Sequence, residues 1–248
     1  MRRARFYRDV LVEKTGEAYG ILLDGKPIKT PAGAAFLLPN ENLARAVAEE
    51  WQAQGENIRP ETLHLTKLAN TAIDRVALHR EAFIEQILAF AKSDSLCYRA
   101  TAPQDLVARQ AAQWDPLLEW AREHYGAPLH TTAGIGFVEQ PPEAIEGLAL
   151  ALEGHDNFAL GALNAAAALT GSTIIALGLA EGRLDADAAF AASQLDEIYQ
   201  AEKWGQDDEA LIRSRNKAVE LTQIARFFRL YPEGRRGMGG WRRRDAAV

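Results

Sequence analysis

The sequence is poor in cysteine, with Cys97 alone among its 248 residues. An internal disulfide is therefore excluded, and such sparing use of cysteine is typical of a reducing compartment. The chain also has no apolar run behind its basic first residues, so its start does not resemble a secretory signal. We therefore expect a cytoplasmic protein of a bacterium, or a protein of the mitochondrial matrix.

The motifs that mark common cofactor and metal sites are missing as well. There is no Gly-x-x-x-x-Gly-Lys-Ser/Thr phosphate loop, and Gly134 with Gly136 lacks the third glycine of a dinucleotide fingerprint. No two of the five histidines have the spacing of paired metal ligands on a helix, and Cys97 has no partner thiol. We therefore expect no cofactor, no metal site and a buried, structural Cys97.

Charge is absent from one long stretch, residues 158–180. A segment of this length could cross a bilayer, which takes about 20 residues. However, the stretch is rich in Ala and Gly, contains Asn164, and is flanked by acids instead of Lys or Arg anchors. The sequence therefore predicts two short buried helices that meet at Gly171, and no membrane insertion.

The N-terminal third combines strand and helix patterns. The stretches FYRDVLVEK and EAYGILLDGKPIKT have strand character, and Asp24-Gly25 is a favourable two-residue hairpin turn. Asn40 then precedes a predicted helix that runs to Gln54, with Gly55 as its stop. This part is therefore expected to be a small β-rich unit with flanking helices.

From about residue 80 onward, the apolar spacing is helical and no segment has strand character. The sequence therefore predicts an α+β fold, with a β-rich N-terminal domain over residues 1–95 and an all-α C-terminal domain over residues 96–231. The Gly- and Arg-rich end, residues 232–248, is expected to be disordered.

A helix is predicted from Leu184 to Lys203. One apolar stripe follows it, formed by Leu184, Ala188, Ala191, Leu195 and Ile198. Because each residue turns a helix by about 100°, Trp204 falls away from this stripe and on the same side as Glu197. We infer that Trp204 either packs against another element or is presented to a partner protein.

A second helix is predicted from Asp208 to Leu230. Its apolar stripe consists of Leu211, Ala218, Leu221, Ala225 and Phe228. The two stripes can pair as a helical hairpin about Gly205. Asp207, Asp208 and Glu209 stand at the positive end of the second helix, which favours acids without any catalytic role.

Several long motifs resemble those of one family, in the same order along the chain. SQLDEIYQAEKWGQDDEA is similar to the family's signature helix, and FYRDV and LLDGKPIKTPA to its opening hairpins. EWQAQGENIRPETLHLTKLANTAIDRV resembles its central block, and SDSLCYRATAPQDLVARQAAQWDPLLEWAREHYG the start of its helical domain. The family is that of the assembly chaperones for the alpha subunit of F-type ATP synthase, found in mitochondria and related bacteria.

The resemblance implies a chaperone without enzymatic activity. Such a protein binds the unassembled alpha subunit and shields its subunit interface until a beta subunit displaces the chaperone. An acidic residue of the signature helix matters in the family, and we place it at Asp196, with Glu197 as the alternative. We assign Gln200 and Trp204 to the same partner-binding surface, although Trp204 could instead brace the N-terminal domain, a role that we favour.

Three residues are assigned structural roles. The resemblance implies that the tryptophan of the EW motif, Trp51, matters in the family. Because Trp51 shares an apolar helical face with Leu43 and Val47, we expect it to act through folding. Trp114 is assigned to the helical domain and Gly205 to the bend between the last two helices.

Two other functions remain open. In the first, the acidic cluster of the 184–203 helix, with Asp196, Glu197 and Glu202, lines the pocket of a small-molecule enzyme. In the second, the Arg-rich tail binds nucleic acid or acidic lipid. The net charge of −6 argues against nucleic acid. We expect a monomer whose partner is the alpha subunit.

Overall fold

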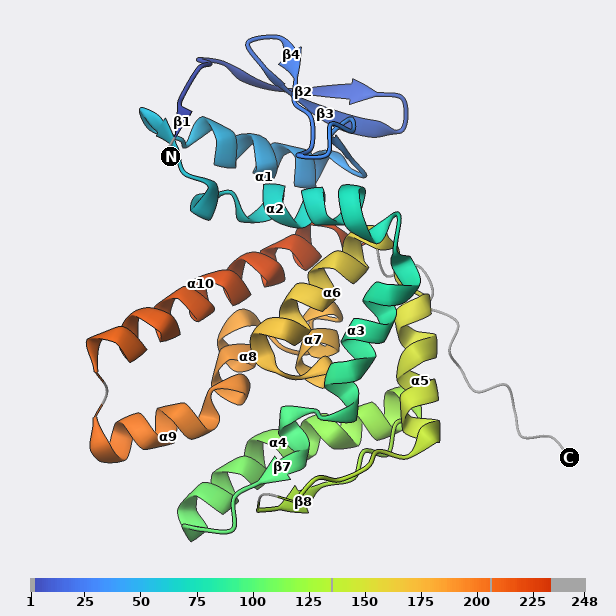
Figure 1. Ribbon diagram of the computed structural model, residues 1–248, viewed down its shortest axis with the longest axis vertical. Coiled ribbons are helices and arrows are strands. Elements are labelled where there is room, and N and C mark those ends of the chain that lie inside the picture. Colours follow the sequence, from blue (N-terminus) through green and yellow to red (C-terminus); the bar gives the residue numbers. More distant parts are fainter. Residues whose placement is uncertain (1–2, 135, 206, 233–248) are drawn as a thin grey trace, which may run out of the picture.

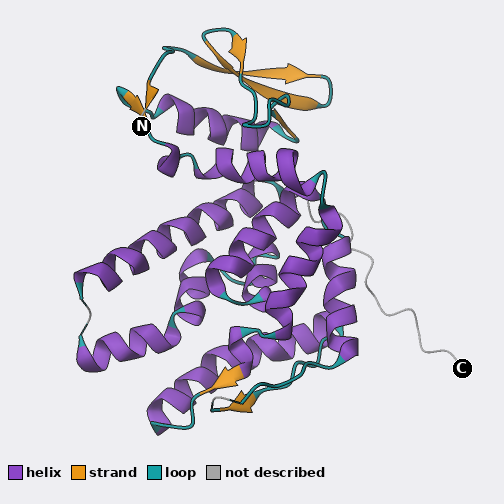
Figure 2. Ribbon diagram, in the orientation of Figure 1, coloured by secondary structure: helices purple, strands orange, loops and turns teal. Residues whose placement is uncertain are grey.

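The computed structural model describes residues 3–134, 136–205 and 207–232 (Figure 1). A small β layer with two helices forms one end of the molecule, and the other helices form a larger body beside it (Figure 2). The predicted α+β class is confirmed. One buried apolar core runs from Ile21 in the β layer to Tyr231 after the last helix, so the two parts share a continuous core.

The predicted division into domains near residue 95 stays a prediction. The helix α3 (Arg80–Lys92) lies before this point in the sequence, yet it packs against helices of the larger body. The predicted tail, residues 232–248, lies outside the described residues except for Pro232.

The β layer is built on one hairpin. β2 (Val10–Thr15) pairs antiparallel with β3 (Ala18–Leu23) along its full length. β3 then turns through Asp24 and Gly25, with φ of +48° and +76°, into β4 (Lys26–Pro27). Two successive positive φ values are the conformation that a two-residue hairpin requires, so the turn predicted at these positions is confirmed.

One helix, α1, packs against this layer, and a second, α2, packs against α1. α1 (Glu41–Gln52) begins where the Asn40 side chain accepts the N–H of Leu43 (2.9 Å), which confirms the predicted cap. α2 (His64–Thr71) continues into a π-helical turn, η2 (Ala72–Val76). Three short strands and a 3-10 turn complete this part: β1 (Arg3–Ala4), β5 (Leu37–Leu38), β6 (Asn57–Ile58) and η1 (Pro60–Thr62).

The start of α2 is capped by a side chain from α1. Leu63, which precedes α2, offers no side-chain cap. The buried carboxylate of Glu50 instead accepts the N–H groups of Leu65 (2.6 Å) and Thr66 (2.9 Å). Burial raises the pKa of Glu50, and these hydrogen bonds oppose the rise. Glu50 therefore fixes α1 against α2.

Two short apolar helices form the centre of the larger body. α6 (Asn157–Thr170) ends at Gly171, whose φ is +72°, and α7 (Thr173–Ala180) begins directly after it. The predicted pair of buried helices meeting at Gly171 is confirmed. Within the described residues, no helix has the length and apolar character that crossing a membrane requires.

A buried carboxylate joins the end of α3 to α7. Asp94 lies between α3 and the short turn η3 (Ser95–Cys97) and is fully buried. Its two oxygens accept the N–H of Leu96 (3.1 Å) and the N–H of Ile174 in α7 (3.2 Å). Burial raises the pKa of Asp94 to about 6, although these hydrogen bonds favour the ionised form.

The outer helices α4 (Gln104–Tyr125) and α5 (Pro142–Glu153) flank this centre. The strand β7 (Tyr98–Arg99), which precedes α4, pairs in parallel with β8 (Thr132–Ala133), which precedes α5. The prediction that no strand follows residue 80 is therefore wrong. Strands of two residues are too short for an alternating pattern to appear in the sequence.

The predicted helix over residues 184–203 is wrong in one respect, because it is divided. The backbone at Gln194 leaves the helical conformation (φ −120°, ψ 18°) and separates α8 (Ala186–Ser193) from α9 (Leu195–Trp204). Of the predicted stripe, Leu195 is the one residue that is buried. The buried residues of the two helices are Ala189, Ala192, Leu195 and Tyr199.

The last helix, α10 (Asp208–Leu230), has the predicted bounds. Its buried residues are Leu221, Ile224, Phe227 and Phe228, so only part of the predicted stripe is internal. α10 packs mainly against α8, α6 and α2, and it diverges from α9 beyond Gly205 (Figure 1). The last helix thus pairs with α8, the first half of the predicted 184–203 helix, whereas its predicted pairing with the second half, α9, is wrong.

Replacing Asp94 by Asn should remove part of the pH dependence of stability. Because its folded-state pKa is raised, Asp94 favours the folded state most below about pH 4, and this contribution is lost as the pH rises through about 6. Between pH 4.5 and 7.5, the unfolding free energy of the wild type should fall relative to that of Asp94→Asn by about 2 kcal/mol. Urea denaturation measures this difference, and parallel pH profiles would contradict it.

Gly147→Ala should destabilise the protein although Ala is the better helix former. A Cβ at this position of α5 would lie 2.3 Å from the carbonyl oxygen of Tyr125, so α4 and α5 must move apart. We expect a loss of about 1–3 kcal/mol in unfolding free energy. Gly161→Ala is the matched control, since its Cβ meets Val76 at 3.5 Å, an ordinary contact. Equal stability of the two variants would contradict the close approach.

Candidate functional site

α9 is held against α4 along one of its faces. The buried Tyr199 donates its hydroxyl to Asp105 (2.7 Å), and Lys203 pairs with the same carboxylate (3.1 Å). Glu202 pairs with Arg109 (2.7 Å). Hydrogen bonds from Tyr199 and then Lys203 lower the pKa of Asp105. These contacts decide which face of α9 is left to solvent.

The two acids predicted to contact a partner have different surroundings. Asp196 accepts a hydrogen bond from Nε2 of Gln110 in α4 (2.7 Å). Gln110 is itself buried and accepts the N–H of Ala100 (2.8 Å). Glu197 is exposed on the surface of α9. Asp196 therefore contributes to the attachment of α9 as well as to its surface, whereas Glu197 belongs to the surface.

Trp204 ends α9 with 77% of its surface exposed. Glu197, Gln200 and Trp204 follow one another at steps of three and four residues and are all exposed, so they share one face of the helix. The predicted bracing of the N-terminal domain by Trp204 is wrong, because the side chain lies in solvent. Gly205, with φ of +80°, then turns the chain away from the axis of α9.

The first half of α10 adds apolar surface to this end of the molecule. Leu211, Ile212 and Val219 are exposed by 36%, 56% and 49%. α9 and α10 diverge from Gly205 onward, so their far ends lie apart (Figure 1). We give the name α9–α10 surface to five exposed residues of the two helices, which are Glu197, Gln200, Trp204, Ile212 and Val219.

Sequence reasoning missed the contribution of α10. Leu211 was expected inside the helix pair, and Ile212 and Val219 were not singled out. The sequence did contain one indication of this apolar surface. The seven-residue spacing of Ile212 and Val219 puts both side chains on one face of α10, away from the predicted stripe. Their exposure follows from the direction that α10 takes after Gly205.

The acids of α9 do not line either of two prominent cavities. One of these, of about 1030 Å³, lies in the N-terminal part, and the other, of about 710 Å³, lies between the end of α1 and α10. Asp196, Glu197 and Glu202 line neither. Within the described residues, no three His, Cys, Asp or Glu side chains are grouped so as to hold a metal ion. Neither of these two cavities is therefore the pocket of an enzyme built on these acids.

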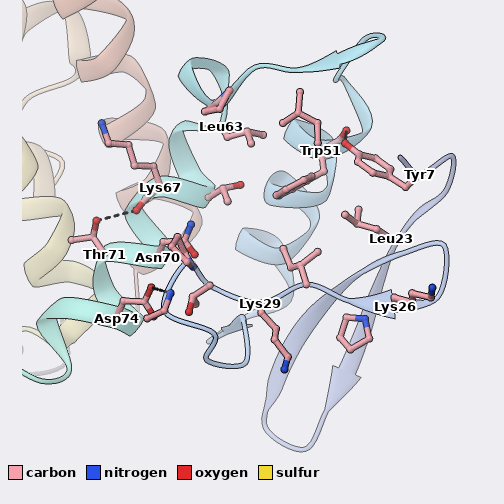
Figure 3. Close-up of a pocket in the computed structure, with 18 of the residues that line it drawn as sticks. Tyr7, Leu23, Lys26, Lys29, Trp51, Leu63, Lys67, Asn70, Thr71 and Asp74 are labelled. Carbon is pink, nitrogen blue, oxygen red and sulfur yellow. Dashed lines mark hydrogen bonds between the residues drawn. The ribbon is translucent and has the colours of Figure 1, made fainter. Parts of the chain in front are cut away.

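The larger cavity lies between the hairpin of the β layer and the helices α1 and α2 (Figure 3). Tyr7, Leu23 and Leu63 belong to a small apolar cluster at this place, and Trp51 packs against it. Trp51 was predicted to be a core residue. The structure leaves it half-buried, so that it packs on the core and also faces the cavity.

Two further residues have the structural surroundings that were predicted. Trp114 is 5% exposed and donates its indole N–H to the carbonyl of Ala192 (2.9 Å), which joins α4 to α8. Cys97 is fully buried, and burial raises the pKa of its thiol to about 12. A buried thiol with a raised pKa is a poor nucleophile, which agrees with the structural role expected of Cys97.

Several known proteins are similar to this chain. Residues 4–122 match the model of a family described as ATP12 chaperone protein. Protein atp12, mitochondrial, of Schizosaccharomyces pombe is 26% identical over 218 residues, which cover 83% of this chain and 75% of that protein. The crystal structure of Atp12 from Paracoccus denitrificans is 39% identical with a TM-score of 0.86, over 92% of this chain and 98% of that one.

A second solved structure is similar to this chain to the same extent. The Atu1473 protein of Agrobacterium tumefaciens is 43% identical with a TM-score of 0.86, over 91% of this chain and 84% of that one. Because each of these alignments covers more than nine-tenths of this chain, the similarity includes both the β layer and the helical body. The resemblance noted in the motifs is thereby confirmed, and the chain belongs to the ATP12 chaperone family.

Proposed function

We propose that this protein is an assembly chaperone of F-type ATP synthase that binds the unassembled alpha subunit of the catalytic head. The α9–α10 surface covers the area of the alpha subunit to which a beta subunit later binds. Docking of the beta subunit then displaces the chaperone. The protein catalyses no reaction and acts as a monomer.

The exposure of Trp204 is the observation that carries this proposal. A tryptophan with 77% of its surface in solvent contributes little to the stability of its own chain. Burial of such a side chain is a common source of binding energy at protein interfaces. Because Glu197 and Gln200 are beside it, the surface has the aromatic centre and polar rim that interfaces share.

The charge of the surface indicates what the client must offer. Glu197 lies on α9, and Asp207 and Asp208 begin α10, whereas Glu209 beside them is already paired with Arg213 (2.7 Å). The first three of these carboxylates favour a client patch that has Lys or Arg around an apolar centre. An exposed patch of that kind on an unassembled subunit is prone to aggregate, and covering it is the task of a chaperone.

The attachment of α9 to α4 supports a preorganised surface. Leu195 and Tyr199 bury the inner face of α9, and the ion pairs of Glu202 and Lys203 fix its second half. A helix held in this way loses little conformational freedom when a partner binds, so more of the contact energy appears as affinity.

The tagged protein should co-purify with the alpha subunit when that subunit is expressed alone, and should not co-purify with the beta subunit. Addition of beta subunit to the preformed complex should release the chaperone, because both compete for one area. Size-exclusion chromatography of the mixtures measures both results. Capture of the beta subunit alone, or of neither subunit, would contradict the proposal.

Trp204→Ala should weaken binding of the alpha subunit by at least about tenfold, because the variant removes the aromatic anchor. Its unfolding free energy should change by less than about 0.5 kcal/mol, since the side chain is exposed. Phe137→Ala is the matched control, because Phe137 is 75% exposed and lies on neither α9 nor α10. Isothermal titration calorimetry measures both affinities.

Glu197→Lys provides a second variant at the same surface. It is preferable to Asp196→Lys, which also removes the hydrogen bond to Gln110 and so disturbs the attachment of α9. If the affinities of Trp204→Ala and Glu197→Lys both equal that of the wild type, the binding surface lies elsewhere on the molecule.

A further inference from the structure

The cavity between the hairpin and α2 has features that the α9–α10 surface does not explain. Its volume of about 1030 Å³ is at the upper end for pockets that hold a ligand. Tyr7, Leu23, Trp51 and Leu63 give it an apolar wall (Figure 3). The ring of Trp51 points into the cavity in the same view.

Three buried polar atoms of the residues around this cavity have no hydrogen-bond partner within the described residues. They are Nε1 of Trp51, Oδ1 of Asn70 and Oδ1 of Asp74. An unsatisfied buried polar group is unfavourable, so a ligand that satisfies it gains affinity. Because each of these atoms has less than 1 Å² of accessible surface, a ligand reaches them only when the side chains of the cavity wall shift. These atoms comprise one donor and two acceptors. A matching ligand therefore offers both a hydrogen-bond acceptor and hydrogen-bond donors.

The edges of the cavity are cationic. Lys26, Lys29 and Lys67 are exposed around it, and none of the ion pairs found among the described residues involves these three side chains. Two acids also line the cavity, and each accepts backbone N–H groups through one carboxylate oxygen, which leaves Oδ1 of Asp74 without a partner in the part of the chain that the structure describes. Asp24 accepts the N–H groups of two residues of the preceding strand region, and Asp74 accepts the N–H of Ala32 (3.1 Å). The lysines thus remain available to a ligand of negative charge.

We propose that this cavity binds an extended, acidic segment of a polypeptide partner. A peptide backbone has both a carbonyl, which can accept from Trp51 Nε1, and N–H groups, which can donate to Asn70 and Asp74. An apolar side chain of the segment packs against the wall around Trp51, and its acids pair with the lysines at the edge. This inference rests on the proposed function, because the client supplies the segment.

The position of the cavity makes it a second contact for that client. It lies in the β layer, and α10 separates it from α9 (Figure 1). A client held at both places is bound through two linked sites, so its overall affinity exceeds that of either site.

Nuclear magnetic resonance of the full-length, ¹⁵N-labelled protein tests the site directly. The indole N–H signal of Trp51 is assigned by its loss in Trp51→Phe. The probe is a capped nine-residue peptide of glutamate with leucine at every third position. We expect this peptide to shift the Trp51 signal saturably, and the matched peptide with lysine in place of glutamate to leave it unchanged.

Charge reversal at the edge provides the matched variants. The double variant Lys26→Glu, Lys67→Glu should bind the acidic peptide about tenfold more weakly. The control Lys14→Glu, Lys92→Glu reverses two exposed lysines that do not line the cavity, and its affinity should stay within about twofold of the wild type. All four substituted side chains are exposed, so each variant can fold, which circular dichroism checks.

Three results would overturn the inference: a Trp51 signal that does not respond to the acidic peptide, an equal response to the lysine peptide, or a response to decanoate alone. A response to decanoate would mean that the cavity binds small amphiphiles.

Failure of the proposed function can be told apart from failure of the cavity site, because the former appears as loss of alpha-subunit capture while the Trp51 signal still responds to the peptide. If the alpha subunit is captured but the Trp51 signal does not respond to the acidic peptide, only the proposed cavity site is contradicted.

Discussion

The first N–H groups of α2 and α7 point into the protein interior, where a helix start lacks acceptors of its own. Two buried carboxylates meet this constraint. Glu50 of α1 accepts the first N–H groups of α2, and Asp94 at the end of α3 accepts the N–H of Ile174 in α7. Each of these bonds joins segments that are distant in sequence. At these two helix starts, therefore, the hydrogen bonds to the backbone also fix one helix against another.

Local signals made much of the fold predictable from the sequence. The turn at Asp24, the cap at Asn40 and the stop at Gly171 each depend on a backbone conformation that one residue type favours. The break at Gln194 has no such signal, since neither glycine nor proline is present there. It arises because α8 packs on α10 whereas α9 packs on α4, and one straight helix cannot do both.

The candidate surface was predictable to the extent that it lies within one helix. Helical geometry alone placed Glu197 and Trp204 on a common face. It could not say that this face is open, because that depends on the direction of α10 after Gly205. The cavity near Trp51 was out of reach for a related reason: its walls come from the chain's first residues, the hairpin, α1 and α2, which tertiary contacts alone bring together.

The two halves of α9 are held by forces of different kinds. Leu195 and Tyr199 are buried, so their attachment is insensitive to salt. The ion pairs of Glu202 and Lys203 lie at the surface and are screened as ionic strength rises, with a Debye length of about 8 Å under physiological conditions and about 3 Å in 1 M salt. Concentrated salt therefore loosens the last turn of α9, including Trp204, while the first turns stay docked on α4.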